Sequence, residues 1–202
     1  IVLKSGGDRT FCAGASFEEL IAISNPVEGA EFFEGFANVI NALRNCPKIT
    51  IGRVQGKAVG GVVGLAAATD YCMAITHSEI KLSELTIGIG PFVIEPAVTR
   101  KIGLSAMSQL SLEASAFFSA QWAQEKGLYM KLCPSLDALD HEVKSLAEQL
   151  CTYNLEALQK LKETFWEGTE HWGKLLQDRA AISGRLVLSD FTISAINQFK
   201  KK

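Results

Sequence analysis

Two glycine-rich turns carry backbone N–H groups that could stabilise negative charge. The first spans residues 12–16 (CAGAS) and the second residues 56–61 (GKAVGG), and each lies between a predicted strand and a predicted helix. The first N–H groups of a helix have no partner within the helix, so they attract a phosphate or an oxyanion that forms during a reaction. Close packing of a strand on a helix also calls for glycine. Either turn alone therefore leaves an anion site and plain packing as alternatives.

A nucleotide phosphate is the less favoured ligand for these turns. Neither turn has the pattern GxxxxGK followed by Ser or Thr, and residues 60–64 (GGVVG) lack the GxGxxG arrangement of a dinucleotide fold. A nucleotide-binding α/β protein is therefore the weaker alternative.

A glutamate lies further along the chain in a segment that could carry acid–base chemistry. Residues 82–92 have the sequence LSELTIGIGPF, which places Glu84 between Leu82 and Leu85. Partial burial among such neighbours disfavours the charged carboxylate and raises its pKa toward neutrality, as a group that shuttles protons requires. The alternative is a glutamate exposed on a strand edge.

Other reactive side chains show no usable pattern. His77, His141 and His171 have no ligand spacing with one another or with the cysteines, so no metal site is predicted. Cys12 lies beside the first turn without an identifiable histidine partner, and we interpret it as a small packing residue.

Composition excludes several classes of partner. Lys and Arg number 20 against 22 for Asp and Glu, and this net charge of −2 gives no positive field to hold nucleic acid. The 5 cysteines form no CxxC pair and favour a reducing compartment over a disulfide framework. No apolar run approaches the roughly 20 residues that cross a bilayer. We therefore expect a soluble protein without nucleic-acid or membrane partners.

The elements that must position these turns alternate over the first half of the chain. Strand patterns cover residues 1–4, 49–55, 72–76 and 80–82, and an amphipathic helix runs through residues 32–43 before Pro47. From about Pro96 onward only helical patterns are predicted. This order predicts an α/β core at residues 1–104 and a helical region at residues 105–202. Because the chain opens inside a strand and without methionine, we expect its first strands to be missing.

Taken together, three ordered motifs resemble the crotonase, or enoyl-CoA hydratase/isomerase, superfamily. They are the FCAGA turn at residues 11–15, the GxxxGG turn at residues 56–61, and Glu84 seven residues before Pro91. The similarity covers essentially the whole chain, since residues 124–128 (QEKGL) also look like the family's. It implies a crotonase-type spiral of β-β-α repeats with an all-helical C-terminal extension.

The resemblance also implies roles for single residues. The N–H groups of Ala15 and Gly61 would form an oxyanion hole for a thioester oxygen, and Glu84 would be catalytic. Losing one such N–H donor typically costs about 3 kcal/mol. The implied ligand is an acyl-CoA thioester, with coenzyme A entering as part of the substrate and no separate cofactor. Implied substrate-binding residues are Ala13, Ala15, Ser16, Phe17 and Gly61.

The sequence differs from the hydratases at two places, and these differences leave the type of reaction open. Gly64 stands where the hydratases carry a second glutamate, and residues 91–96 (PFVIEP) replace a glycine-rich segment. Both features are similar to the 3-methylglutaconyl-CoA hydratase-like branch. Hydration of an enoyl-CoA is therefore the first hypothesis, with double-bond isomerisation by Glu84 alone and non-catalytic acyl-CoA binding as alternatives. Glu95 is a candidate second carboxylate, although a glutamate at a helix start more often stabilises the helix dipole.

Assembly and location follow from the same resemblance. It implies a homotrimer or hexamer in which C-terminal helices help to close the active site. The region around Trp166, Trp172, Leu175 and Leu188 would suit such an interface or could pack within one subunit. A cytoplasmic enzyme is expected, or one of the mitochondrial matrix in a eukaryote, acting in fatty acid or branched-chain amino acid degradation.

Overall fold

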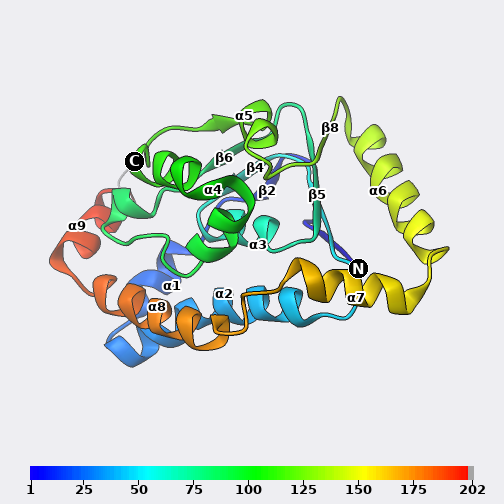
Figure 1. Ribbon diagram of the computed structural model, residues 1–202. Coiled ribbons are helices and arrows are strands. Elements are labelled where there is room, and N and C mark those ends of the chain that lie inside the picture. Colours follow the sequence, from blue (N-terminus) through cyan, green and yellow to red (C-terminus); the bar gives the residue numbers. More distant parts are fainter. Residues whose placement is uncertain (200–202) are drawn as a thin grey trace.

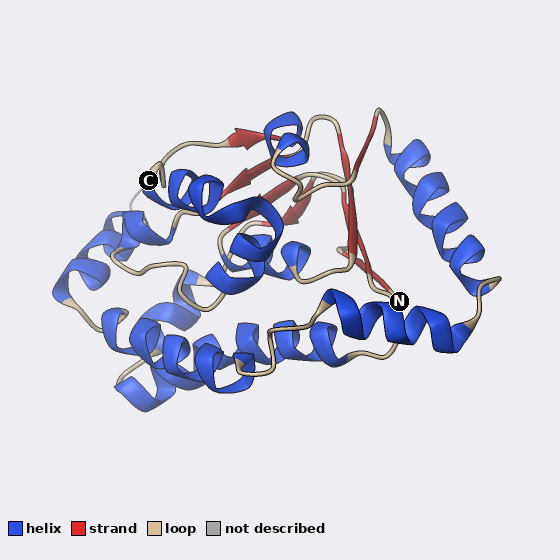
Figure 2. Cartoon of the chain, viewed as in Figure 1, coloured by secondary structure: helices blue, strands red, loops and turns tan. Residues whose placement is uncertain are grey.

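The computed structural model describes residues 1–199, which fold around two four-stranded sheets (Figures 1 and 2). The first sheet is parallel and has the order β1 (Val2–Lys4), β3 (Ile51–Val54), β5 (Tyr71–Ile75), β8 (Lys131–Cys133). The second has the order β2 (Thr10–Cys12), β4 (Lys57–Val59), β6 (Glu79–Lys81), β7 (Phe118–Ser119). In this second sheet only β6 and β7 are antiparallel.

Successive strands alternate between the two sheets and then lead into a helix. The repeats are β1-β2 with α1 (Phe17–Ala22), β3-β4 with α3 (Gly61–Ala67), and β5-β6 with the 3₁₀ helix η1 (Glu84–Ile87). Because β2, β4 and β6 are parallel neighbours, their carboxyl ends lie at the same edge of the sheet. The turns that follow these strands are therefore brought together, and the expected spiral of β-β-α repeats is confirmed.

The remaining helices complete the chain. They are α2 (Pro26–Asn45), α4 (Glu95–Leu112), α5 (Ala120–Glu125), α6 (Leu136–Cys151), α7 (Leu155–Phe165), α8 (Trp172–Leu186) and α9 (Asp190–Phe199). Helices α2 and α8 run side by side, and α6 lies against the first sheet (Figure 1). There Leu139 and Val143 of α6 bury Ile51 and Met73 in a small separate core.

One expectation from the sequence is wrong. Strands do not end near Pro96, because two more follow it. β8 pairs with β5 in the first sheet, and β7 pairs with β6 in the second. The alternative placement of Glu84, exposed on a strand edge, is wrong as well: Glu84 begins η1, and its side chain is largely shielded from solvent. The α/β class with a helical C-terminal region is confirmed. The division at residues 104 and 105 stays a prediction, and the helical path of α4 is interrupted close by, at Gly103 with φ of 76°.

Helices α2 and α8 touch through their backbones. A Cβ atom on Gly29 would lie 2.5 Å from the carbonyl oxygen of Gly184, and one on Gly184 would lie 2.3 Å from the backbone nitrogen of Ala30. Glycine is needed here for space. The contact sets the position of α8 relative to α2, and hence of every α8 side chain on that side.

Gly184→Ala is expected to lower the free energy of unfolding by about 1–3 kcal/mol, because the added methyl group must push α8 away from α2. Urea denaturation checks this against Gly173→Ala, a change in the same helix whose new Cβ would meet nothing within 4 Å. Gly173→Ala should be neutral or stabilising, since alanine favours helix. Equal losses in the two variants would contradict the packing explanation.

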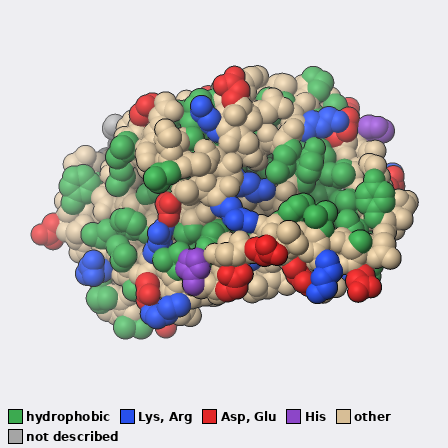
Figure 3. All heavy atoms as spheres, viewed as in Figure 1, with side chains coloured by type: hydrophobic (Ala, Val, Ile, Leu, Met, Phe, Trp, Pro, Cys, Tyr) green, Lys and Arg blue, Asp and Glu red, His purple; other side chains and the backbone are tan. Residues whose placement is uncertain are grey.

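The aromatic side chains considered for an interface are buried within this chain. Trp166 and Trp172 are 8% and 5% exposed, and their rings pack edge to face at 5.8 Å. On the outer surface, acidic and basic side chains are interspersed over the face seen in Figure 3, in keeping with the small net charge. Within residues 1–199, no helix combines the length and the hydropathy that crossing a membrane needs.

Candidate active site

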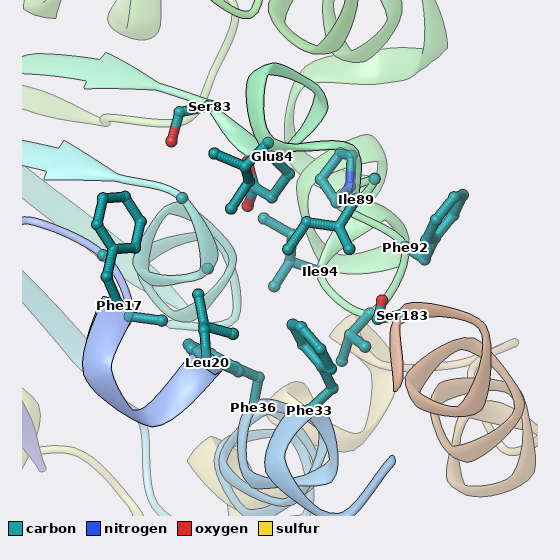
Figure 4. A pocket seen from close by; sticks show the side chains of 18 of the residues that line it. Phe17, Leu20, Phe33, Phe36, Ser83, Glu84, Ile89, Phe92, Ile94 and Ser183 are labelled. Atoms are coloured by element: carbon teal, nitrogen blue, oxygen red, sulfur yellow. The ribbon is translucent and has the colours of Figure 1, made fainter. Parts of the chain in front are cut away.

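The turns after β2, β4 and β6 border a cavity of about 310 Å³ (Figure 4). Most of its wall is apolar: residues 13–15 and α1 supply one side, Phe33 and Phe36 of α2 another, and residues 89–94 a third. Of the described residues that line it, Glu84 alone carries an ionisable side chain. A ligand in this cavity would therefore meet one carboxyl group in apolar surroundings.

The two glycine-rich turns lie side by side at the cavity. A Cβ atom on Gly14, whose φ is 106°, would lie 3.5 Å from the carbonyl oxygen of Val59, which immediately precedes Gly60. Within residues 1–199, the N–H groups of Ala15 and Gly61 have no hydrogen-bond acceptor. Gly61 is the first residue of α3, so its N–H also lies at the positive end of the helix dipole.

Glu84 is placed against the second of these turns. A Cβ atom on Gly60, whose φ is 69°, would lie 3.4 Å from Oε1 of Glu84. The other carboxyl oxygen, Oε2, is shielded from solvent and has no hydrogen-bond partner in the described part of the chain. Burial raises the pKa of Glu84 to about 7, because removal from water penalises the charged form. The carboxyl group can thus gain or lose a proton near neutral pH.

This pKa predicts a pH-dependent stability. The pKa of Glu84 rises from 4.5 to about 7 on folding, so the protonated group favours the folded state below pH 4.5 and this contribution is lost as pH rises through 7. At about 1.4 kcal/mol per pKa unit, the total is on the order of 3 kcal/mol. Glu84→Gln, which keeps the group neutral, should gain stability over wild type between pH 5 and pH 8. Urea denaturation at several pH values tests this; a constant difference would contradict it.

The space beside Gly64 is filled by an isoleucine. A Cβ atom on Gly64 would lie 2.3 Å from Cβ and 2.5 Å from Cγ2 of Ile94. A carboxylate side chain therefore has no room at position 64. Glu95 does not replace it, because Glu95 does not line the cavity; its carboxylate accepts a 2.6 Å hydrogen bond from Thr99 and pairs with Arg179 of α8.

Comparison with known proteins identifies the family. Residues 1–185 match the family described as enoyl-CoA hydratase/isomerase. The chain belongs to the enoyl-CoA hydratase/isomerase family. The fold agrees: an enoyl-CoA hydratase from Bacillus halodurans superposes with a TM-score of 0.86 at 21% identity, covering 98% of this chain and 80% of that one.

Relatives within the enoyl-CoA hydratase/isomerase family carry different names. The ethylmalonyl-CoA decarboxylase of Xenopus tropicalis is 35% identical over 86 residues, which is 43% of this chain and 29% of that protein. The bacillaene synthase dehydratase PksH of Bacillus subtilis is 28% identical over 177 residues, covering 87% of this chain and 62% of its own length. The chain thus spans 29% and 62% of the length of these two relatives.

Most residues that the family resemblance singled out lie at the cavity. Ala13, Ala15, Phe17, Gly61 and Glu84 line it. Ser16 does not; its side chain caps α1 by accepting a 3.3 Å hydrogen bond from the N–H of Glu19.

Sequence reasoning missed several cavity residues from distant segments. Phe33 and Phe36 belong to the helix expected from residues 32–43, but that pattern predicts only an apolar face, not what the face covers. Ile94 lies in the segment 91–96 that was noted only for lacking glycine, and Ser183 belongs to no motif. Only the apolar period of α2 could have suggested its two phenylalanines.

Gly64→Ala is expected to lower the free energy of unfolding by about 1–3 kcal/mol, because its methyl group would overlap Ile94. Ile94→Gly removes the overlapping atoms and also lowers the free energy of unfolding, because it deletes a buried side chain. In the double variant the two losses should therefore not add, which a double-mutant cycle by urea denaturation measures. Additive losses would show that Ile94 does not restrict position 64.

Proposed function

We propose that this chain acts on an acyl-CoA thioester through an enolate, with Glu84 as the group that moves the proton. The supporting observation is a carboxyl group of pKa about 7 beside two turns with unpaired N–H groups, in an otherwise apolar cavity. The N–H groups of Ala15 and Gly61 would bind the thioester oxygen and stabilise the negative charge that develops on it. Glu84 would then take or return the proton at carbon.

Double-bond isomerisation is the reaction that this geometry supports best. Glu84 would remove a proton from one carbon of an enoyl chain, the electron pair would delocalise onto the thioester oxygen, and the same carboxyl group would return the proton to another carbon. One carboxyl group suffices. Hydration, our first hypothesis from sequence, needs a positioned water as well, and Ile94 fills the space beside Gly64 that a second carboxylate would need. Glu84 acting alone on a bound water remains the hydratase alternative.

Decarboxylation is a second candidate, favoured by the similarity to the Xenopus tropicalis ethylmalonyl-CoA decarboxylase and by the raised pKa of Glu84, which lets the group be protonated near neutral pH. In a thioester with a carboxylate on the carbon next to the carbonyl, the C–C bond would break and CO₂ would leave. The electron pair would form the enolate held by Ala15 and Gly61, and the neutral carboxyl group of Glu84 would supply the proton. Apolar surroundings disfavour the charged substrate carboxylate and so assist its loss.

NMR in heavy water separates these reactions. The wild-type chain is incubated with 2-enoyl-, 3-enoyl- and ethylmalonyl-CoA thioesters. A shifted double bond supports isomerisation, with deuterium in the chain where Glu84 exchanges its proton with solvent before returning it. A new hydroxyl group supports hydration, and a saturated product with deuterium next to the carbonyl supports decarboxylation. Binding of the thioesters with neither a new product nor deuterium entry would overturn the enolate mechanism and favour the non-catalytic binder.

The cofactor, assembly, family branch, pathway and compartment expected for this protein stay predictions. The proposed chemistry uses no redox or metal cofactor, and coenzyme A enters with the substrate. Trimeric or hexameric assembly, the 3-methylglutaconyl-CoA-like branch, the metabolic pathway and the compartment are proposals of the same kind. Sedimentation of the purified protein tests the assembly directly.

A further inference from the structure

A serine lines the cavity on the side formed by α8. Ser183 is 1% exposed and belongs to the cavity lining. Figure 4 shows it near Phe92 and Phe33, away from Ser83 and Phe17 on the opposite side of the view. The N–H groups of Ala15 and Gly61 lie with α1 and α3. The cavity runs from these turns to α8, so an acyl chain that fills it from a thioester held there would reach the α8 side.

The hydroxyl group of Ser183 is available to a ligand. Serine inside a helix often donates to the carbonyl group four residues earlier. Within residues 1–199, the Ser183 side chain makes no such bond and no other hydrogen bond. This hydroxyl group borders the cavity, where an apolar ligand would strip it of water and leave it without a partner, so a ligand atom that hydrogen-bonds it is favoured.

The backbone around Ser183 holds this hydroxyl group in place. The next residue, Gly184, is the one that contacts Gly29 of α2, so α8 cannot move closer at this point. One turn earlier, Arg179 donates a 3.2 Å hydrogen bond to the carbonyl oxygen of Phe92 and pairs with Glu95. Two separate contacts therefore hold the α8 side of the cavity in place. A residue that selects a ligand needs such a fixed backbone.

The surroundings of Ser183 favour a neutral ligand group. The described residues that line the cavity include no lysine, arginine or histidine. A substrate carboxylate held beside Ser183 would thus lack a counter-charge, and burying an unpaired charge is far more costly than burying a hydroxyl or carbonyl group. A plain hydrocarbon end would leave the serine unpaired.

We propose that Ser183 is a specificity-determining residue that hydrogen-bonds a neutral oxygen on the distal part of the acyl chain. The preferred substrate is then a short acyl-CoA thioester with a distal hydroxyl or keto group. This assignment rests on the proposed function, because it takes the thioester to be held at Ala15 and Gly61.

Matched thioesters test the assignment. Three enoyl-CoA thioesters of equal chain length end in a methyl, a hydroxymethyl or a carboxylate group, and kcat/KM is measured for wild type and Ser183→Ala. Wild type should prefer the hydroxymethyl substrate, and Ser183→Ala should lower its kcat/KM about tenfold, the effect of one neutral hydrogen bond, while sparing the methyl substrate. Ser108→Ala, an exposed serine of α4, should change neither. An unchanged ratio in Ser183→Ala, or a preference for the carboxylate, would overturn the assignment.

Calorimetric binding of the saturated analogues distinguishes this failure from failure of the proposed reaction. If no thioester turns over but the hydroxymethyl analogue binds better than the methyl one, and Ser183→Ala removes that difference, the assignment holds and the reaction does not. If turnover occurs with the same selectivity in wild type and Ser183→Ala, the reaction holds and the assignment is wrong.

Discussion

Glu84→Gln is expected to lower kcat by about 10²- to 10⁴-fold, with a much smaller change in KM. General acid–base catalysis by a positioned side chain contributes about that factor. Glutamine keeps the size and the neutral polarity of the protonated carboxyl group but cannot release a proton. Because the wall around Glu84 is apolar and the described lining has no other ionisable side chain, no neighbour can take over the transfer.

Steady-state kinetics with the substrate found by NMR measures this loss. Glu79→Gln is the matched control: Glu79 pairs with Lys57 on the second sheet and does not line the cavity. Its kcat should stay within about twofold of wild type, as expected of a surface ion pair. Glu95→Gln tests the other candidate carboxylate, and we expect it to retain chemistry because Glu95 lies outside the cavity lining. Full turnover by Glu84→Gln would remove Glu84 from the mechanism.

Lys162→Met is expected to lower the free energy of unfolding by about 3–5 kcal/mol. The Lys162 ammonium group lies 2.9 Å from Oδ2 of Asp70, and the two side chains are 3% and 2% exposed. It also donates to the carbonyl oxygens of Leu43 and Lys48 at 2.8 and 2.9 Å. Removing one partner of a buried pair leaves the other charge without compensation in a low-dielectric site, and that is the costly step.

The same helix offers a matched control. Lys160 pairs with Glu163 at 2.7 Å, but these side chains are 68% and 51% exposed. Lys160→Met should change stability by less than about 1 kcal/mol, because water already screens both charges. Urea denaturation of the two variants at pH 7 gives the comparison. Equal losses would show that burial of the Lys162 pair is not what stabilises α7.

The Asp70 pair also explains how the helical region is attached to the core. Asp70 accepts hydrogen bonds from the N–H and hydroxyl group of Thr50 and from the Trp166 indole at 2.9 Å. One carboxylate thus joins the end of α3, the segment before β3, and α7. None of these residues lines the cavity. Lys162→Met should therefore lower stability without changing kcat in the fraction that stays folded.

The sequence by itself determined which residues form the two glycine-rich turns. Strand patterns followed by small residues and a helix predicted the turns around Ala15 and Gly61, because a chain that leaves a strand for a helix must expose N–H groups there. The parallel order of the repeats then places these turns and Glu84 at one edge. The family resemblance supplied that order, because the local pattern predicted only one strand before each turn and missed β2 and β4.

Only the tertiary structure decided what surrounds those turns. β7 and β8 are two and three residues long, too short for a periodic pattern, and they form because neighbouring strands pair with them. Ile94 fills the space at Gly64, and Ser183 reaches the cavity from α8, across a separation that no local pattern encodes. Lys162 lies in a helix rich in exposed charges, yet it is buried because Asp70 and two carbonyl groups meet it there. These features depend on contacts between segments far apart in the sequence, and a local residue pattern does not specify such contacts.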